Sequence, residues 1–147
     1  MAQEAGRGVR QGRGAMPVGG RATRGVTFDT GMLIALERRH AGALALLRAC
    51  RLSRAPITIP AAVVAEWWRG THRALLEVGS LEPLTPALAQ RAGELLATTR
   101  GSNAVDATVV ASAAQRGDLV VTGDAGDLRP LAACVDGVAV EGLRHPS

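Results

Sequence analysis

Lysine is absent from this chain, and all 17 of its basic residues are arginine. The absence excludes a P-loop nucleotide site, a Schiff-base enzyme and a kinase-type ATP site, because each depends on a lysine amine. The three histidines, His40, His72 and His145, stand apart, and we expect each to be a solvated surface residue. The Gly-x-Ser-x-Gly elbow and the His-Glu-x-x-His pair are missing as well, which removes two further hydrolase classes.

Cysteine, aromatic residues and long apolar runs are also scarce. Cys50 and Cys134 have no partner at metal-ligand spacing, which predicts buried free thiols in a reducing compartment. With one Phe and no Tyr, recognition of bases by aromatic stacking is not expected. No apolar run approaches the roughly 18 residues of a membrane span, and no apolar secretory segment follows the first residues. We therefore expect a soluble, cytoplasmic protein without a membrane partner.

The net charge of +4 comes from residues 1–25, which hold five arginines and one acid, whereas the rest of the chain holds twelve of each. This Gly- and Arg-rich segment has no apolar periodicity, which predicts a disordered tail. It could bind nucleic acid nonspecifically, or it could be a translated stretch upstream of the true start. We expect one domain at 26–142 and a short C-terminal tail at 143–147.

Short apolar or β-branched segments alternate with helical ones in this domain. The expected strands are 26–28, 57–59, 81–84, 119–122 and 138–140, and the expected helices are 30–38, 41–52, 61–69, 86–99 and 103–116. Strands separated by helices predict an α/β fold with a central, mainly parallel sheet of about five strands.

Carboxylates stand where several of these elements begin or end. Asp29 follows the first strand, Asp106 lies in the first turn of a helix, Asp124 and Asp127 follow a late strand, and Glu66 lies midway along an apolar helix. Ligands of open parallel sheets bind beyond the carboxyl ends of the strands, so these acids can meet at one edge. Because clustered anions destabilise one another without a cation, their convergence favours a metal site.

Each acid also has a purely structural explanation. Asp29 could cap the helix that follows it, and Asp106 could belong to a capping box begun by Asn103. Turn formation in a Gly-rich loop would explain Asp124. A salt bridge to an arginine on the same helix would explain Glu66.

Four stretches of the sequence carry a resemblance to a known family. They are Phe28-Asp29-Thr30-Gly31, the mid-chain Glu66, Val105-Asp106-Ala107 and Leu119-Val120-Val121-Thr122-Gly123-Asp124. Together they resemble the PIN-domain ribonucleases over about residues 26–140, and in size the chain is most similar to the VapC toxins of bacterial VapBC toxin–antitoxin pairs. The resemblance implies a three-layer α/β/α sandwich.

The resemblance also implies a site and an activity. Asp29, Glu66, Asp106 and Asp124 correspond to the family's catalytic metal ligands, and Asp127 to a less constant fifth acid. Oxygen ligands without thiolate or imidazole select Mg²⁺ or Mn²⁺, which can hold a scissile phosphate and activate a water. The implied activity is a Mg²⁺- or Mn²⁺-dependent endoribonuclease toxin.

The implied partners are an RNA substrate, a cognate VapB-like antitoxin and a second copy of the chain in a homodimer. Arginines between residues 38 and 73 could bind RNA phosphates. Trp67 and Trp68 are adjacent on a helix, so either one of them faces a partner or a single wide face buries both. One departure from the family is Gly31, where Ser or Asn is common, and it puts in question a polar contact near the metal.

Two other functions stay open. A HAD-type phosphatase is suggested by Asp29 after a strand and by the late Gly-rich loop around Asp124, but that class needs a second acid where Gly31 stands and a lysine. A noncatalytic RNA-binding PIN-like module would bind RNA without cutting it.

Overall fold

The computed structural model describes residues 24–143, and the expectations for residues 1–23 and 144–147 lie outside this part of the chain. A five-stranded sheet with the order β3-β2-β1-β4-β5 runs through the molecule, and every neighbouring pair of strands is parallel. The strands are β1 (Val26–Phe28), β2 (Ile57–Pro60), β3 (Ser80–Glu82), β4 (Leu119–Thr122) and β5 (Ala139–Gly142). The predicted parallel α/β sheet is therefore confirmed.

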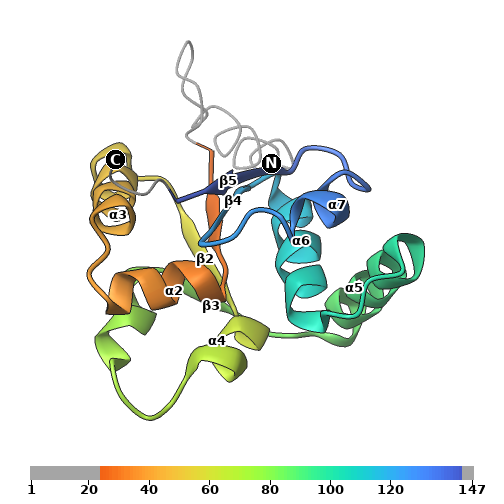
Figure 1. Ribbon diagram of the computed structural model, residues 1–147, viewed down its shortest axis with the longest axis horizontal. Coiled ribbons are helices and arrows are strands. Elements are labelled where there is room, and N and C mark those ends of the chain that lie inside the picture. Colours follow the sequence, from red (N-terminus) through yellow and green to blue (C-terminus); the bar gives the residue numbers. More distant parts are fainter. Residues whose placement is uncertain (1–23, 144–147) are drawn as a thin grey trace, which may run out of the picture.

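Helices cover both faces of this sheet. They are α2 (Thr30–Glu37), α3 (Ala41–Ser53), α4 (Ala61–Trp67), the 3₁₀ helix η2 (Arg73–Val78), α5 (Pro86–Thr99), α6 (Ala104–Arg116) and α7 (Arg129–Ala132). In Figure 1, α2 and α3 lie on one side of the strands, and α5, α6 and α7 lie on the other. The described chain thus forms the three-layer sandwich that the sequence predicts.

The ends of several elements differ from the predicted ones. The helix expected at 61–69 ends at Trp67, because Trp68 has an extended backbone (ψ 131°) and Gly70 follows with a positive φ of 87°. The third strand is Ser80–Glu82 rather than 81–84, and the short helices η2 and α7 were not predicted. Their apolar residues are too few for a helical period to be read from them.

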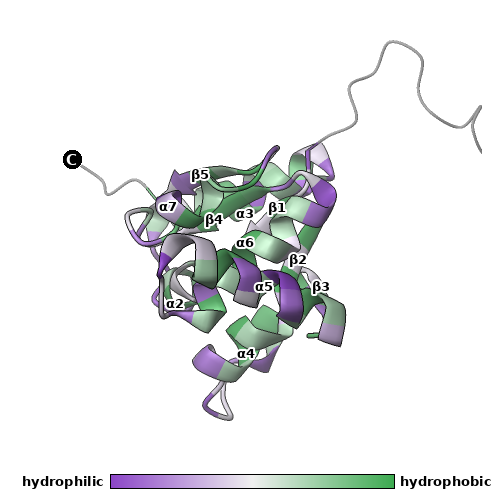
Figure 2. Ribbon diagram, turned by 90° about the vertical axis from the view of Figure 1, so that its right-hand side faces the viewer, coloured by the Kyte–Doolittle hydropathy of each residue, from purple (hydrophilic) through white to green (hydrophobic). Residues whose placement is uncertain are grey.

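The three central strands, β1, β2 and β4, are buried nearly along their length, whereas the edge strands β3 and β5 are more exposed. Every residue of β1 and β2 is buried, which is the pattern of parallel strands covered on both faces. Figure 2 shows hydrophobic residues along the strands and hydrophilic stretches on the outer helix α5. The fully buried side chains come from the strands, α2, α4, α5, α6 and the loop before α7, among them Phe28, Leu33, Ile59, Val109 and Val120. None of the helices within residues 24–143 has the length and apolar character to cross a bilayer.

The strand order reverses between β1 and β4. From β1 the chain continues to β2 and β3 on one side, whereas β4 and β5 lie on the other side. At such a switch point the connections leave the sheet in opposite directions and open a crevice beyond the carboxyl ends. Asp29 directly follows β1, and Asp124 follows β4 by two residues.

A polar network lies between α6 and the sheet, and the sequence analysis did not predict it. The Arg116 Nε donates to Asp118 Oδ2 at 2.9 Å, its Nη2 donates to Thr27 Oγ1 at 3.1 Å and Ser112 Oγ at 2.9 Å, and its Nη1 donates to Glu82. Thr27 Oγ1 also donates to Asp118 Oδ2 at 2.8 Å. Asp118 is 3% exposed, so this guanidinium neutralises a buried carboxylate.

The burial of the cysteines and of the tryptophans can be compared with what the sequence predicts. Both thiols are free, and Cys50 is buried as predicted, but Cys134 is exposed because it lies in the loop after α7. Trp67 is 7% exposed and Trp68 is half-buried, with their rings 5.9 Å apart. Neither indole is exposed, which favours the interpretation that one wide face takes up both.

Candidate metal centre

The five acids singled out in the sequence line one pocket of about 300 Å³. The pocket lies at the switch point between β1 and β4, and it is also lined by residues of α2 and of the N-terminal end of α6. The acids are Asp29, Glu66, Asp106, Asp124 and Asp127. The fold therefore brings together carboxylates that are as far as 98 positions apart in the chain.

Asp29 is the most deeply placed of the five, with 7% of its surface exposed. Its Oδ1 accepts a hydrogen bond from the Met32 backbone N–H at 2.9 Å, so the residue caps α2 as well as lining the pocket. Burial raises the pKa of the Asp29 carboxyl, against the opposing effect of hydrogen bonds from Thr122 and Met32. The structural explanation, a cap on α2, is therefore confirmed, and the same carboxylate also lines the acidic pocket.

Asp106 lies in the first turn of α6 and is half-buried. Its backbone N–H donates to the Asn103 side chain at 3.0 Å, which is one of the two hydrogen bonds of a capping box. Burial, and after it the charges of Asp29 and the other three acids of the pocket, raises the pKa of the Asp106 carboxyl to about 6. Such mutual repulsion requires that the carboxylates share one space.

Asp124 is held by a tight turn after β4. The Thr122 hydroxyl accepts from the Asp124 N–H at 3.0 Å, and its oxygen lies 3.1 Å from the Asp124 carbonyl oxygen. One carboxylate oxygen of Asp124 accepts from the Gly126 N–H at 3.0 Å. Asp124 is therefore a turn former, as the structural explanation had it, and its exposed side chain still lines the acidic pocket.

Glu66 reaches the pocket from α4, but its surroundings differ from the prediction. The sequence places it among apolar residues, whereas the side chain is exposed. The ion pairs of residues 24–143 include none between Glu66 and an arginine, so the same-helix salt bridge does not form there. Its place in the pocket follows from the contacts of α4 with α2 and α6.

Glu37, at the C-terminal end of α2, joins α2 to α4. One of its carboxylate oxygens accepts from Trp67 Nε1 at 3.1 Å, and the other lies 3.1 Å from His72 Nε2. Because Trp67 follows Glu66 directly, this contact fixes the helix that presents Glu66. No motif in the sequence indicates it, since the partners are 30 and 35 positions apart.

The donor set fits a hard divalent cation. The five side chains offer only carboxylate oxygens, and no ion pair within residues 24–143 involves any of them. Thr30 also lines the pocket, and its buried Oγ1 has no hydrogen-bond partner among the described residues. In the present side-chain positions no three such groups of residues 24–143 are arranged to hold one ion. Carboxylates at the exposed positions would have to rotate toward the pocket to do so.

Several residues that line the pocket are not indicated by the motifs in the sequence. Asn103 and Ile34 belong to it, and Thr122, noted only through the family resemblance, does as well. Asn103 was read as a helix cap, yet its position three residues before Asp106 places both on the same side of the first turn of α6. The spacing of three residues could therefore have identified Asn103 as a residue of the pocket.

Gly31 packs against the loop that carries Asp124, backbone against backbone. A Cβ at position 31 would lie 2.8 Å from the Gly123 N and 3.2 Å from its Cα. In this protein the position where the family often has Ser or Asn thus has no room for a side chain. A side chain there would displace Gly123 and the neighbouring Asp124.

We expect Gly31→Ala to destabilise the protein by about 1–3 kcal/mol, because the added methyl meets backbone that cannot move aside cheaply. Chemical denaturation measures the change. Gly93→Ala is the matched control, since Gly93 also lies in a helix but a Cβ there meets nothing within 4 Å. The control should be neutral or slightly more stable than the wild type. Equal effects of the two variants would contradict the close approach.

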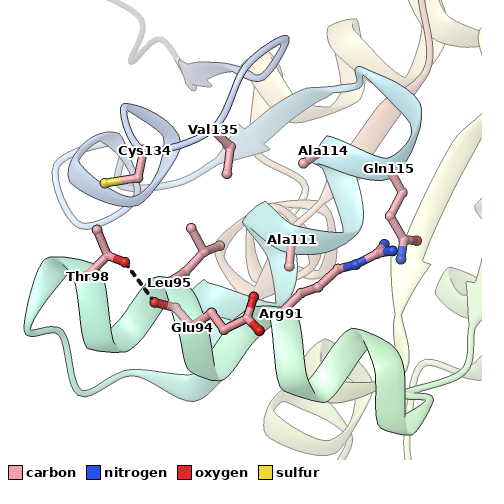
Figure 3. A pocket seen from close by; sticks show the side chains of 9 residues that line it. All are labelled: Arg91, Glu94, Leu95, Thr98, Ala111, Ala114, Gln115, Cys134 and Val135. Atoms are coloured by element: carbon pink, nitrogen blue, oxygen red, sulfur yellow. Dashed lines mark hydrogen bonds between the residues drawn. The ribbon is translucent and has the colours of Figure 1, made fainter.

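A separate hollow of about 400 Å³ lies away from the acids. Figure 3 shows it between α5, α6 and the segment after α7, with Cys134 toward one end and Gln115 toward the other. The Thr98 hydroxyl donates to the Glu94 carbonyl at 3.0 Å on its α5 side. None of the five acids lines this hollow, so it has no part in the candidate metal centre.

Comparison with solved structures finds a similar fold in several chains. A toxin–antitoxin complex from Klebsiella pneumoniae contains a chain with 22% identity and a TM-score of 0.59, over 78% of this chain and 95% of that one. VapBC2 from Rickettsia felis, bound to a DNA fragment from its promoter, gives 13% identity and a TM-score of 0.63, over 81% and 98%. FitAcB from Neisseria gonorrhoeae gives 18% and 0.59, over 78% and 95%. No curated protein matches the sequence.

The family comparison is more specific than the structural one. The model of the PIN domain matches residues 26–129, which include all five acids of the pocket and four of the five strands. The chain therefore belongs to the PIN domain family.

Proposed function

We propose that this protein is a divalent-metal-dependent endoribonuclease that acts as the toxin of a toxin–antitoxin pair. The observation that carries the proposal is the convergence of five carboxylates in one pocket at the switch point of a parallel sheet. Membership of the PIN domain family supports nuclease chemistry. One fold neighbour comes from a structure described as a toxin–antitoxin complex, which supports the biological role.

The five acids of the pocket would have different roles in metal binding and catalysis. Asp29, Asp106 and Asp124 would hold Mg²⁺ or Mn²⁺, Glu66 would bind the ion or position a water, and Asp127 would support a second ion. The ion supplies positive charge for the scissile phosphate and lowers the pKa of an attacking water. Asp29 is fixed in place as a helix cap, which pre-positions its carboxylate. No nucleophilic side chain is needed for hydrolysis of this kind.

A cognate VapB-like antitoxin and a second copy of the chain are the proposed protein partners. The antitoxin is supported by the fold neighbour that was solved as a toxin–antitoxin complex from Klebsiella pneumoniae. The HAD-type phosphatase gains no support, because Gly31 stands where that class needs an acid and the match is to the PIN domain. A noncatalytic RNA-binding module is the remaining competitor.

Divalent ions should both stabilise the protein and activate its cleavage of RNA. At tenfold their dissociation constant, Mg²⁺ or Mn²⁺ should raise the melting temperature by about 3–6 °C, since they relieve repulsion among the carboxylates. Differential scanning fluorimetry with and without the ion measures the shift, and a gel assay on RNA measures cleavage. RNA retained but left intact at saturating ion would identify a noncatalytic module and refute the nuclease.

A further inference from the structure

A second hollow opens directly beside the acidic pocket. It measures about 260 Å³, and Gly31, Ile34 and Gly123 line both spaces. Ala35 and Arg38 on the α2 side, His40 at the start of α3 and Leu143 after β5 complete its wall. A molecule held over the five acids would therefore reach into this hollow without leaving the surface.

The walls of this hollow suit a flat, mostly apolar ring. Ile34 and Ala35 are half-buried aliphatic residues, and the glycines at 31 and 123 present bare backbone. No acidic residue lines it, in contrast to the pocket beside it. Its volume lies below the roughly 300–1,000 Å³ of pockets that enclose drug-sized ligands, so one small ring system is the appropriate occupant.

Two side chains at this hollow can stack on a base. Arg38 is exposed at the C-terminal end of α2, and His40 is half-buried at the N-terminal cap of α3. Guanidinium planes and imidazole rings both stack on unpaired bases, and an exposed guanidinium also attracts the phosphates on either side. The scarcity of Phe and Tyr in the sequence argues against stacking, but this arginine–histidine pair can provide it without either residue.

We infer that this hollow is a subsite for one nucleobase of the RNA, adjacent to the phosphate that lies over the acids. The inference rests on the proposed function, because it takes the acidic pocket as the place of the scissile phosphate. A base can enter only when it is unstacked and unpaired. The protein therefore selects single-stranded RNA or a loop, through Arg38, His40 and the apolar floor of Ile34 and Ala35.

The opposite side of the acidic pocket is different. A hollow of about 470 Å³ there shares Asn103, Asp106 and Asp127 with the pocket and continues along the C-terminal end of α5. Its lining combines polar residues such as Thr99 and Ser102 with the apolar Leu96, Pro130 and Leu131. This hollow is wider and more polar than the one beside Ile34, so we expect a base to be required on the Ile34 side of the phosphate only.

An abasic scan tests this subsite. Single-stranded RNAs of one fixed sequence carry one abasic nucleotide at successive positions around the mapped cut, and cleavage is measured under single-turnover conditions. Affinity is measured in parallel by fluorescence anisotropy without divalent ion. Loss of the base at one position beside the cut should reduce the cleavage rate or the affinity by about 10- to 100-fold, the size of a lost stacking contact. The other side of the cut should tolerate the change.

Variants of the wall connect that position to this hollow. Ala35→Phe fills the space and Arg38→Gln removes the guanidinium, so either should lower the rate on intact RNA and abolish the penalty of the abasic nucleotide. Arg91→Gln is the control, because Arg91 is exposed on α5 and lines neither this hollow nor the acidic pocket. The stabilisation by Mg²⁺ should be the same in all three variants, since none of them alters an acid.

The outcomes separate this subsite from the nuclease itself. Efficient cleavage with no sensitive position would overturn the subsite and leave the nuclease intact. Binding without cleavage, but with one sensitive position in the anisotropy scan, would refute the nuclease and support the subsite. If another segment or a partner fills the hollow, Ala35→Phe will leave RNA affinity and cleavage unchanged, and the inference fails.

Discussion

Asp29→Asn is expected to reduce divalent-dependent RNA cleavage by on the order of 100-fold or more, because it removes the most buried anionic ligand of the pocket. Asparagine keeps the size of the side chain and one oxygen that can accept the hydrogen bond from the Met32 N–H. The cap on α2 therefore survives, since Asn and Asp cap helices about equally well. The loss should appear in the cleavage step of a gel assay at saturating Mg²⁺.

The same substitution should not weaken the fold in the absence of divalent ions. Burial raises the pKa of the Asp29 carboxyl, so its ionised form costs folding free energy at neutral pH. The sign follows from linkage: a raised carboxyl pKa destabilises the folded state above that pKa, and the penalty disappears as pH falls below the unfolded value of 3.8. Asn removes the penalty at pH 7, so the melting temperature without ion should be unchanged or higher.

The ion response then distinguishes a ligand from a structural acid. In Asp29→Asn, the stabilisation by Mg²⁺ should shrink or vanish together with cleavage. Asp136→Asn is the matched control, because Asp136 is exposed and lies outside the pocket. Full cleavage by Asp29→Asn would sink the assignment of this carboxylate, and an equal loss in Asp136→Asn would show that charge alone, not position, explains the effect.

The meeting of Asp29, Asp106 and Asp124 in one pocket could be predicted because each of the three stands at a recognisable boundary. Asp29 and Asp124 follow short apolar strands, and Asp106 follows a helix cap, so the parallel α/β order is enough to send them to one edge. The nature of the elements was also readable, since strands buried on both faces are continuously apolar. The sequence pattern could not predict how deeply each side chain is buried.

Glu66 shows why the sequence pattern does not predict the solvent exposure of a side chain. Its neighbours in the sequence are apolar, yet α4 ends one residue later, at Trp67, and the carboxylate faces the open pocket. Its exposure depends on how α4 docks on α2 and α6, which is set by tertiary contacts such as the one between Glu37 and Trp67. The contact between Gly31 and Gly123 is of the same kind, because it joins residues 92 positions apart through bare backbone.

The hydrogen-bond network around Arg116 could not be predicted from the sequence either. In the sequence this arginine is an ordinary basic residue in the last turn of a helix, which the helix dipole favours. Its partners Thr27 and Glu82 lie on β1 and β3, which are not neighbours in the sheet. Only the packing of α6 across the sheet places one guanidinium within reach of both.

Arg116→Met is expected to be the most destabilising single change among those considered, at about 3 kcal/mol. Methionine retains the apolar stem but leaves Asp118, which is 3% exposed, without its cation, and Glu82 loses its ion pair while keeping the hydrogen bond from Ser112. Removing one member of a buried ion pair usually costs about 3–5 kcal/mol, and the partial exposure of the Arg116 side chain, 30%, places the effect at the lower end. Urea denaturation measures it as a lower midpoint at constant slope.

Two further variants decide whether the lost charge is the cause. Arg48→Met, on the exposed face of α3, replaces the same residue types outside the network and should change stability by less than about 0.5 kcal/mol. Asp118→Asn added to Arg116→Met should restore part of the loss, since it removes the uncompensated buried carboxylate while Thr27 can still donate to the remaining oxygen. Strictly additive effects of the two substitutions would mean that packing, and not the buried charge, governs this side of the sheet. Because the network lies away from the acidic pocket, the Mg²⁺ response of each folded variant should match that of the wild type.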